Sequence, residues 1–438
     1  MSVTATTAVP RTARPHLVLG LLTLGFLLNS LDRSIISVLL EPIGREFGAT
    51  DTQLGLLTGP VFAVVYAIAG LPIAAWADGG RHRTVLVVGV LFWSAMTAAC
   101  GLAPAFAWLL LARMGVAAGE AAGTPASHAL IAGTYVPERR ATALSVYAIG
   151  APAGVALAGF LGGHGHELFG WRTTLMLAAV PGVVLAAAML IVLEQPARLA
   201  SNVAAQGLSW LQTVRAMWPM RPYRHLWIGS ALHCIALFSA SGFNTAFLMR
   251  SHGWSASVAG TLVGGLGIAG AFGTFFGGWC ADWLIRRHGG DGVWNLRFAA
   301  MTTLLTAPFQ CAAYLATDSA WVVLLLPFAG FLGNAFLGPT YAATQAFAPP
   351  AARSRAVAVL MLAMTLVGMG LGPLLVGATS DWLDEVAAVD SLRYALLLAP
   401  ACNVWAAMHF TIAARASSAP AGGAGSGRPP DPVTSSAD

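Results

Sequence analysis

Twelve apolar stretches, each long enough to cross a lipid bilayer, restrict what this chain can fold into. A membrane-spanning helix needs about 20 predominantly apolar residues. The stretches lie at residues 17–40, 52–76, 84–103, 105–136, 141–163, 171–193, 223–249, 255–285, 296–316, 320–347, 356–380 and 392–414. Of the 438 residues 57% are hydrophobic and only 9% are charged, against about 25% charged in soluble proteins. We therefore predict an all-α membrane protein.

The arginines predict how these helices are oriented. All 23 basic residues are Arg, and a cytoplasmic amino terminus places seventeen of them on the cytoplasmic side. The four that fall outside are Arg45, Arg172, Arg250 and Arg393. Because cytoplasmic loops are enriched in basic residues, we expect both termini in the cytoplasm. The short loops favour a bacterial inner membrane.

The halves of the chain resemble each other, which predicts a duplicated architecture. Helices 2 and 8 are each followed by an acid and a basic cluster, at Asp78, Arg81 and Arg83 and at Asp282, Arg286 and Arg287. Such repeats are typical of transporters whose halves rock around a central site. We expect six-helix bundles at 17–194 and 223–415, a cytoplasmic linker at 195–222, and disordered segments at 1–16 and 416–438.

The same two loops are candidates for a cytoplasmic gate. A carboxylate at Asp78 or Asp282 can accept hydrogen bonds from the amino end of a helix across the seam between the halves, where the helix dipole favours an anion. The alternative is a solvated loop whose arginines only set the topology.

Four ionisable residues lie where a bilayer disfavours them. Asp32 and Arg33 lie within 17–40, and Arg113 and Glu120 lie within 105–136. A charge at the membrane centre costs about 2.5–3.5 kcal/mol on insertion scales, so such residues usually face a bundle interior or a wet cavity and mark a transport path. Two cations and two anions suggest mutual pairing.

Helix geometry predicts which of these charges meet. At 1.5 Å per residue, Asp32 and Arg113 lie about 12 Å below the outer membrane face and Glu120 about 22 Å below it. Side chains lean toward the amino end of their helix, which brings Arg33 toward Glu120. We expect Arg33–Glu120 and Asp32–Arg113 contacts, with Asn29 orienting Arg33. The alternative is that the two ion pairs only hold the helices together. This explains the four charges less well, because buried ion pairs stabilise a fold poorly compared with apolar packing.

Proton coupling follows if one carboxylate titrates. Burial raises a carboxylate pKa and a neighbouring Arg lowers it. An Arg that moves to a substrate anion leaves its acid unpaired, and that acid then takes up a proton. Glu120 is the first candidate because it is deeper, and Asp32 is the second.

At these residues the chain resembles the major facilitator superfamily. The resemblance implies that family's fold, twelve transmembrane helices in two pseudo-symmetric six-helix bundles. The first loop keeps the acid and the basic cluster of the family signature, but Ala74 replaces its leading Gly. The second copy, with Gly278 before Asp282, is nearer to the pattern.

Within that superfamily the chain is most similar to the Spinster-like group. The residues that carry this similarity are Leu31-Asp32-Arg33, Arg113-x-Gly115-x-x-x-Gly119-Glu120-Ala121, Gly170-Trp171-Arg172, Gly372-Pro373 and Ser380-Asp381. The group is associated with proton-linked movement of lysophospholipids and sphingoid lipids. The resemblance therefore implies an amphipathic lipid-like substrate, with a small organic anion:proton symporter or a drug exporter as alternatives.

The remaining expectations concern energy and partners. The absence of Lys excludes a P-loop, so the transmembrane proton gradient, and no cofactor, is expected to drive transport. Nucleic acid is not expected as a partner, and a monomer is. An enzyme would need a nucleophile with a base or a ligand set. The His164, His166 and Glu167 group is the one candidate, and its spacing suits a solvated turn better than a metal site.

Overall fold

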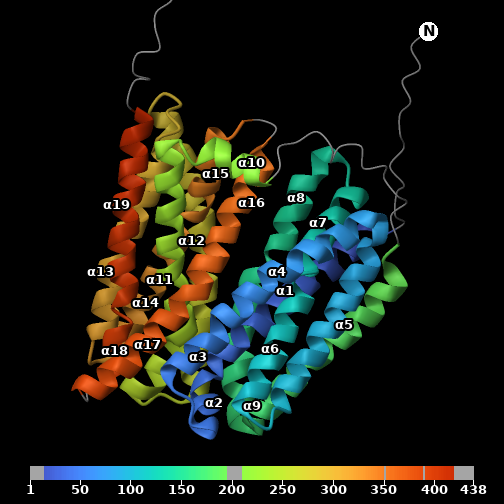
Figure 1. Cartoon of the computed structure of the whole chain (residues 1–438), viewed down its shortest axis with the longest axis vertical. Helices are drawn as coiled ribbons and strands as arrows, with labels where there is room; N and C mark the ends of the chain where they lie inside the picture. Colours follow the sequence, from blue (N-terminus) through green and yellow to red (C-terminus); the bar gives the residue numbers. More distant parts are fainter. Residues whose placement is uncertain (1–13, 195–209, 350–351, 388–389, 419–438) are drawn as a thin grey trace, which may run out of the picture.

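The computed structural model is helical almost throughout and describes residues 14–194, 210–349, 352–387 and 390–418 (Figure 1). The amino-terminal helices are α1 (Pro15–Val38), α2 (Leu40–Phe47), α3 (Asp51–Thr58), α4 (Pro60–Trp76), the π-helical segment η1 (Ala77–Arg81), α5 (His82–Gly101), α6 (Phe106–Glu120), α7 (Gly123–Thr134), α8 (Pro137–Ala148) and α9 (Gly150–Val192).

After α10 (Trp210–Met217) come the carboxy-terminal helices. These are α11 (Arg221–His252), α12 (Ala256–Arg287), α13 (Trp294–Leu315), α14 (Ser319–Asn334), α15 (Leu337–Phe347), α16 (Arg353–Ala363), the π-helical segment η4 (Met364–Met369), α17 (Gly370–Ala387), α18 (Ser391–Ala395) and α19 (Leu398–Ser418). Most of the predicted terminal segments, and residues 195–209 of the predicted linker, lie outside the described residues. The rest of the linker forms α10, which packs on α16, and the start of α11.

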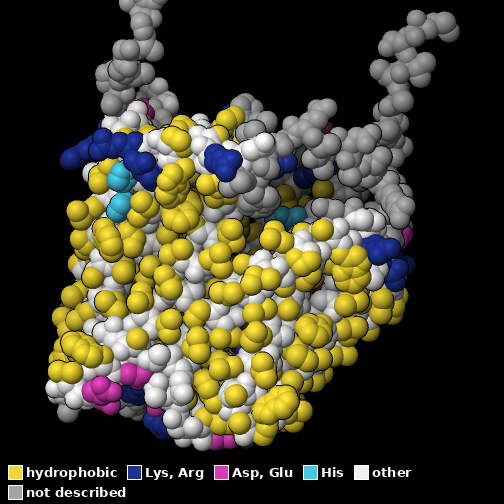
Figure 2. Space-filling view, viewed as in Figure 1, with side chains coloured by type: hydrophobic (Ala, Val, Ile, Leu, Met, Phe, Trp, Pro, Cys, Tyr) yellow, Lys and Arg dark blue, Asp and Glu magenta, His cyan; other side chains and the backbone are white. Residues whose placement is uncertain are grey.

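The molecule has two distinct ends. The helix α1 begins and α19 finishes at one end, which we call the terminal end, whereas α2, α3 and α18 lie at the other, the far end (Figure 1). Hydrophobic side chains cover most of the surface between them, and charged side chains gather toward the two ends (Figure 2). An apolar belt of this extent is foreign to a soluble protein and is what a bilayer requires.

The helices follow the predicted apolar stretches, with breaks that the sequence did not indicate. Residues 105–136 form α6 and α7, separated directly after Glu120. The predicted helices at 141–163 and 171–193 meet in α9, where Gly170 takes a φ of 78°. Ten segments of the described chain are long and apolar enough to cross a membrane, because α9 counts once and α6 and α7 are each too short. Twelve spans and cytoplasmic termini stay predictions.

Local signals fix the turn between α2 and α3 at the far end. Gly48 ends α2 in the left-handed conformation, with a φ of 61°, where Gly is favoured. Thr50 begins α3 with a capping box: its hydroxyl accepts from the backbone N–H of Gln53, and the Gln53 side chain accepts from the Thr50 N–H. Two otherwise unpaired helix donors are thereby satisfied, which sets the direction of α3.

Close backbone contact joins the two groups of helices near the far end. The helix α9 packs against α12, and α3 packs against α17. A Cβ at Gly159 would lie 2.3 Å from the carbonyl oxygen of Gly260, and one at Gly55 would lie 2.4 Å from that of Pro373. Only glycine permits these approaches, so the seam is built for tight closure at this end.

Enlarging Gly159 is expected to prevent that closure. In a cysteine-free background, spin labels at Leu168 on α9 and Val386 on α17 report the far-end separation. Gly159→Val should lengthen the label distance, because the added atoms meet the backbone of α12. The matched control is Gly265→Val on α12, where an added Cβ meets nothing within 4 Å. Identical distance distributions for the two variants would contradict this account of the seam.

Candidate functional site

The predicted contact between Arg33 and Glu120 is present in the middle of the amino-terminal helices. The Arg33 Nη2 lies 2.9 Å from Glu120 Oε2, and its Nε lies 3.3 Å from the same oxygen. The Glu120 side chain is fully buried, whereas that of Arg33 is 30% exposed. A solute can therefore reach the cation but not the anion of this pair.

The expected contact between the side chains of Asp32 and Arg113 is wrong in its detail. Arg113 instead donates to two successive backbone carbonyls of α1, from Nη1 to Asp32 at 3.1 Å and from Nη2 to Arg33 at 3.0 Å. Successive residues point about 100° apart around a helix, so Asp32 and Arg33 do not both face α6. The Asp32 carboxylate turns to α5, where Oδ2 accepts from the Thr97 hydroxyl at 3.2 Å.

Both acids retain one buried oxygen without a hydrogen-bond partner among the described residues. These atoms are Asp32 Oδ1 and Glu120 Oε1. A buried acceptor without a donor is costly when the group carries a charge, and protonation removes that charge. Protein donors therefore do not satisfy either carboxylate fully, as they would in a purely structural lock.

Both cations contact an aromatic ring that was not predicted from the sequence. Phe62 of α4 is completely buried, and its ring centroid lies 4.8 Å from the Arg33 guanidinium carbon and 4.7 Å from that of Arg113. Tyr66, one turn on, lies 5.1 Å from Arg33. Aromatic faces attract cations, so α4 interacts with both guanidiniums through its aromatic side chains. Asn29 is placed as expected, with Oδ1 3.5 Å from Arg33 Nη2.

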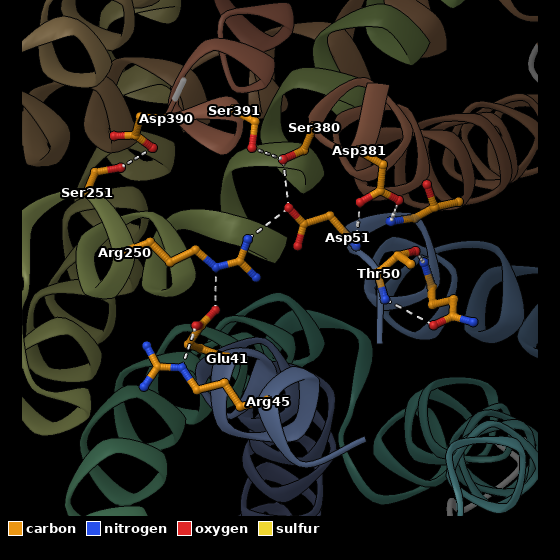
Figure 3. A network of polar contacts seen from close by, with 12 residues as sticks. Glu41, Arg45, Thr50, Asp51, Arg250, Ser251, Ser380, Asp381, Asp390 and Ser391 are labelled. Atoms are coloured by element: carbon orange, nitrogen blue, oxygen red, sulfur yellow. Dashed lines mark hydrogen bonds and ion pairs between the residues drawn. The ribbon is translucent and has the colours of Figure 1, made fainter. Parts of the chain in front are cut away.

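A second polar cluster, also missed from sequence, joins the two groups of helices at the far end (Figure 3). Arg250, near the end of α11, donates to Glu41 of α2 at 2.5 Å and to Asp51 of α3 at 2.8 Å. Asp51 also accepts from the hydroxyl of Ser380 on α17 at 2.6 Å. We call Glu41, Asp51, Arg250, Ser380 and Asp381 the far-end clasp.

Asp381 completes the far-end clasp at the amino end of α3. Its carboxylate accepts from the backbone N–H of Asp51 at 2.9 Å and of Thr52 at 2.8 Å. An anion at a helix amino terminus is favoured by the unpaired N–H groups and the helix dipole. This is the kind of contact that sequence analysis expected at the opposite end of the molecule, at Asp78 and Asp282.

Neighbouring contacts hold the rest of this end in place. Arg172 and Trp171 of α9 donate to Glu46 of α2 at 2.7 Å and 2.6 Å, and the hydrogen bond from Arg172 holds the pKa of Glu46 below its usual range. Glu167 accepts from the backbone N–H of Ser257, which ties α9 to α12.

The expected gate residues at the terminal end are not joined across the seam. Arg81, Asp282, Arg286 and Arg287 are exposed, and none of them forms an ion pair within the described chain. Arg83 donates to the carbonyl of Leu190 on α9, within its own group of helices. The side chain of Asp78 lies outside what the structure describes. A latch formed by these residues stays a prediction about another conformation.

No metal site emerges from the histidines singled out in the sequence. Within the described ranges, no three His, Cys, Asp or Glu side chains gather as metal ligands do. His164 lies 3.0 Å from the carbonyl oxygen of Phe160 through its Nδ1, a local contact along α9.

Comparisons with known proteins point to one family. The sequence profile of the Major Facilitator Superfamily matches residues 22–373. An MFS-type efflux pump of Mycolicibacterium smegmatis is 33% identical over 389 residues, which are 88% of this chain and 89% of the pump. A sphingosine-1-phosphate transporter of Xenopus tropicalis is 25% identical over 417 residues, 89% of this chain and 80% of that protein.

The fold also matches a solved structure closely. The crystal structure of a bacterial homologue of the human lysosomal transporter Spinster, inward-facing and unoccupied, superposes with a TM-score of 0.81 at 29% identity. The match covers 92% of this chain and 98% of that one. In the present chain the two groups of helices are joined at the end away from the chain termini.

Removing the far-end clasp is expected to open the far end. A hydrogen bond to a charged group contributes about 1.5–3 kcal/mol, so Arg250→Gln with Asp381→Asn should raise the open population roughly tenfold or more. A cysteine at Thr58, which is buried at the seam beside Gly242, reports opening through its rate of maleimide alkylation.

The matched control for this experiment is Arg45→Gln. Arg45 pairs with Glu41 within α2 and does not link the two groups, so its loss should leave the alkylation rate unchanged. Equal rates in the clasp variant and in this control would show that the far-end clasp does not hold the seam.

Proposed function

The chain belongs to the Major Facilitator Superfamily and is Spinster-like, and from this premise we propose that it is a proton-coupled transporter of lysophospholipid or sphingoid-like amphiphiles. It is a multi-pass membrane protein and a transporter of a small-molecule substrate, not an enzyme. Its energy source is the transmembrane proton gradient, without a cofactor, across a bacterial inner membrane.

The main support for this proposal is the unequal exposure of the two side chains in the Arg33–Glu120 pair. A substrate anion can compete for the partly exposed Arg33 guanidinium. The Glu120 carboxylate is fully buried, so the anion cannot reach it. Removing one partner of a buried ion pair leaves an uncompensated charge that costs about 3–5 kcal/mol. Proton uptake by Glu120 relieves that cost, so substrate and proton bind together.

Asp32 supplies a second acid in the same cluster. It lies one residue before Arg33, and its carboxylate is held by Thr97, not by a cation. With an unpaired buried oxygen, it is the alternative proton carrier. Arg113 remains bonded to the α1 backbone at both carbonyls, so it positions the helix while Arg33 exchanges partners.

Two further observations support an amphiphile as the substrate. A relative with 25% identity transports sphingosine-1-phosphate. An apolar groove of about 700 Å³ also runs between α9 and α12, lined among others by Ile149, Phe272 and Phe275. It lies on the terminal side of the tight Gly159–Gly260 crossing, where the two helices diverge. An acyl chain fits such an apolar lining.

A drug exporter is the second candidate, because the mycobacterial relative is an efflux pump and is 33% identical. A small organic anion:proton symporter would use the same Arg33 clamp. Both alternatives keep the charge cluster and differ in what fills the apolar groove.

The test is flux of labelled lysophosphatidylcholine in proteoliposomes, with and without a pH gradient. Wild type should show gradient-driven flux, and Glu120→Gln should lose the gradient-driven part because its side chain cannot exchange a proton. Glu385→Gln, an exposed acid at the far end, is the control and should behave as wild type.

The other outcomes separate the alternatives. Gradient-independent flux that is equal in wild type and Glu120→Gln would remove Glu120 from coupling. Absence of lysolipid flux, with transport of a small organic anion or a drug by the same folded protein, would replace the lipid assignment.

A further inference from the structure

A buried histidine with two hydrogen bonds lies among the carboxy-terminal helices, away from the charge cluster. His233 of α11 is 1% exposed. Its Nε2 lies 2.7 Å from the carbonyl oxygen of Gly333 on α14, and its Nδ1 lies 2.7 Å from Oδ1 of Asn403 on α19. Asn403 Nδ2 in turn donates to Gln310 Oε1 of α13 at 2.8 Å. This chain of hydrogen bonds thus connects four helices.

The carbonyl that His233 contacts belongs to a helix end. The helix α14 finishes at Asn334, and two residues separate it from α15. The last carbonyls of a helix lack intrahelical donors and carry the negative end of its dipole. A buried N–H is needed there, and a cationic one is favoured.

The two partners determine how many protons the ring holds. A backbone carbonyl only accepts, so Nε2 carries a hydrogen in every state. With the Asn403 oxygen facing the ring, Nδ1 also carries one and the ring is an imidazolium. If the Asn403 and Gln310 amides both turn over, Asn403 donates to Nδ1 and the ring is neutral. Gain or loss of one proton therefore reverses the polarity of the whole chain of bonds.

The surroundings hold no charge that would fix one of these states. Within the described chain no Arg, Asp or Glu pairs with His233. The ring of Phe336 lies 4.1 Å away. The titratable groups of the hydrophobic cluster that contains Phe336 are Cys234, Tyr341 and Cys402. Toward the terminal end, His225 and His409 face each other across α11 and α19 at 2.9 Å.

We propose that His233, Asn403 and Gln310 form a reversible proton-binding site of the carboxy-terminal helices, distinct from Asp32 and Glu120. The bound proton makes both hydrogen bonds of the ring charge-assisted, the one to Asn403 on α19 and the one to Gly333 at the end of α14. Protonation thus strengthens the joint between α14 and α15. The inference stands whether or not the substrate is a lipid and whether or not Glu120 titrates.

The test is nitrogen-15 NMR of histidine-labelled protein in lipid nanodiscs from pH 5 to pH 9. The chain has ten histidines, and the signals missing from His233→Gln identify His233. We expect its two nitrogens to change from the imidazolium to the neutral pattern within this range. A signal that stays neutral throughout, or stays charged throughout, would overturn the proposal. No transport is measured, so this result is independent of the proposed function.

A pair of variants tests the role of the amide. Asn403→Leu removes the acceptor for the second proton, so proton affinity should fall at least tenfold and the midpoint by about one pH unit. Asn244 is a buried amide on α11, the helix of His233, and it accepts from the Tyr314 hydroxyl. Asn244→Leu should therefore leave the midpoint unchanged. Equal midpoints in Asn403→Leu and wild type would exclude Asn403 from the site and contradict its assignment.

Discussion

The ion pair between Arg33 and Glu120 is the interaction on which the rest of the site depends. A charge pair in the middle of a membrane protein is a poor stabiliser compared with apolar packing, yet the surrounding helices are arranged to hold it. Arg113 donates to the α1 backbone beside it at 3.1 Å and 3.0 Å, and Phe62 contacts both guanidiniums. Because only the cation is partly exposed, the proposed exchange begins with an anion that binds Arg33.

The far-end clasp joins the two groups of helices at one end of the molecule. In this conformation α2 and α3 are bonded to α11 and α17 through Arg250 and Asp381, and Gly159 allows α9 to touch α12. The gate residues of the terminal end are exposed and unjoined among the described residues. The contacts of the far-end clasp close the seam between the two groups of helices at the far end. Alternating access requires that the far-end clasp break while the terminal end closes, and the far-end clasp uses an Asp beside a helix amino terminus.

Much of the fold and part of the site followed from the sequence, and the exceptions have physical reasons. The apolar stretches predicted where the helices lie. The rise of the helix per residue and the tilt of side chains toward the amino end predicted the contact between Arg33 and Glu120. The partner of Asp32 was predicted wrongly because adjacent residues cannot share a helix face. Arg250 was read only as an outside-facing charge, since no local pattern shows which loops meet across the seam. Phe62 and Tyr66 had one available signal, an aromatic pair one turn apart, but many apolar helices carry such pairs.

The most direct measurement of the central claim is the proton balance of substrate binding. Calorimetric titration of a short-chain lysophosphatidylcholine, in two buffers of different ionisation enthalpy, gives the number of protons exchanged. Exchange of Arg33 from Glu120 to the substrate phosphate predicts uptake of about one proton per bound molecule, because the freed acid is buried. Binding without proton uptake in wild type, or uptake that persists in Glu120→Gln, would contradict the account.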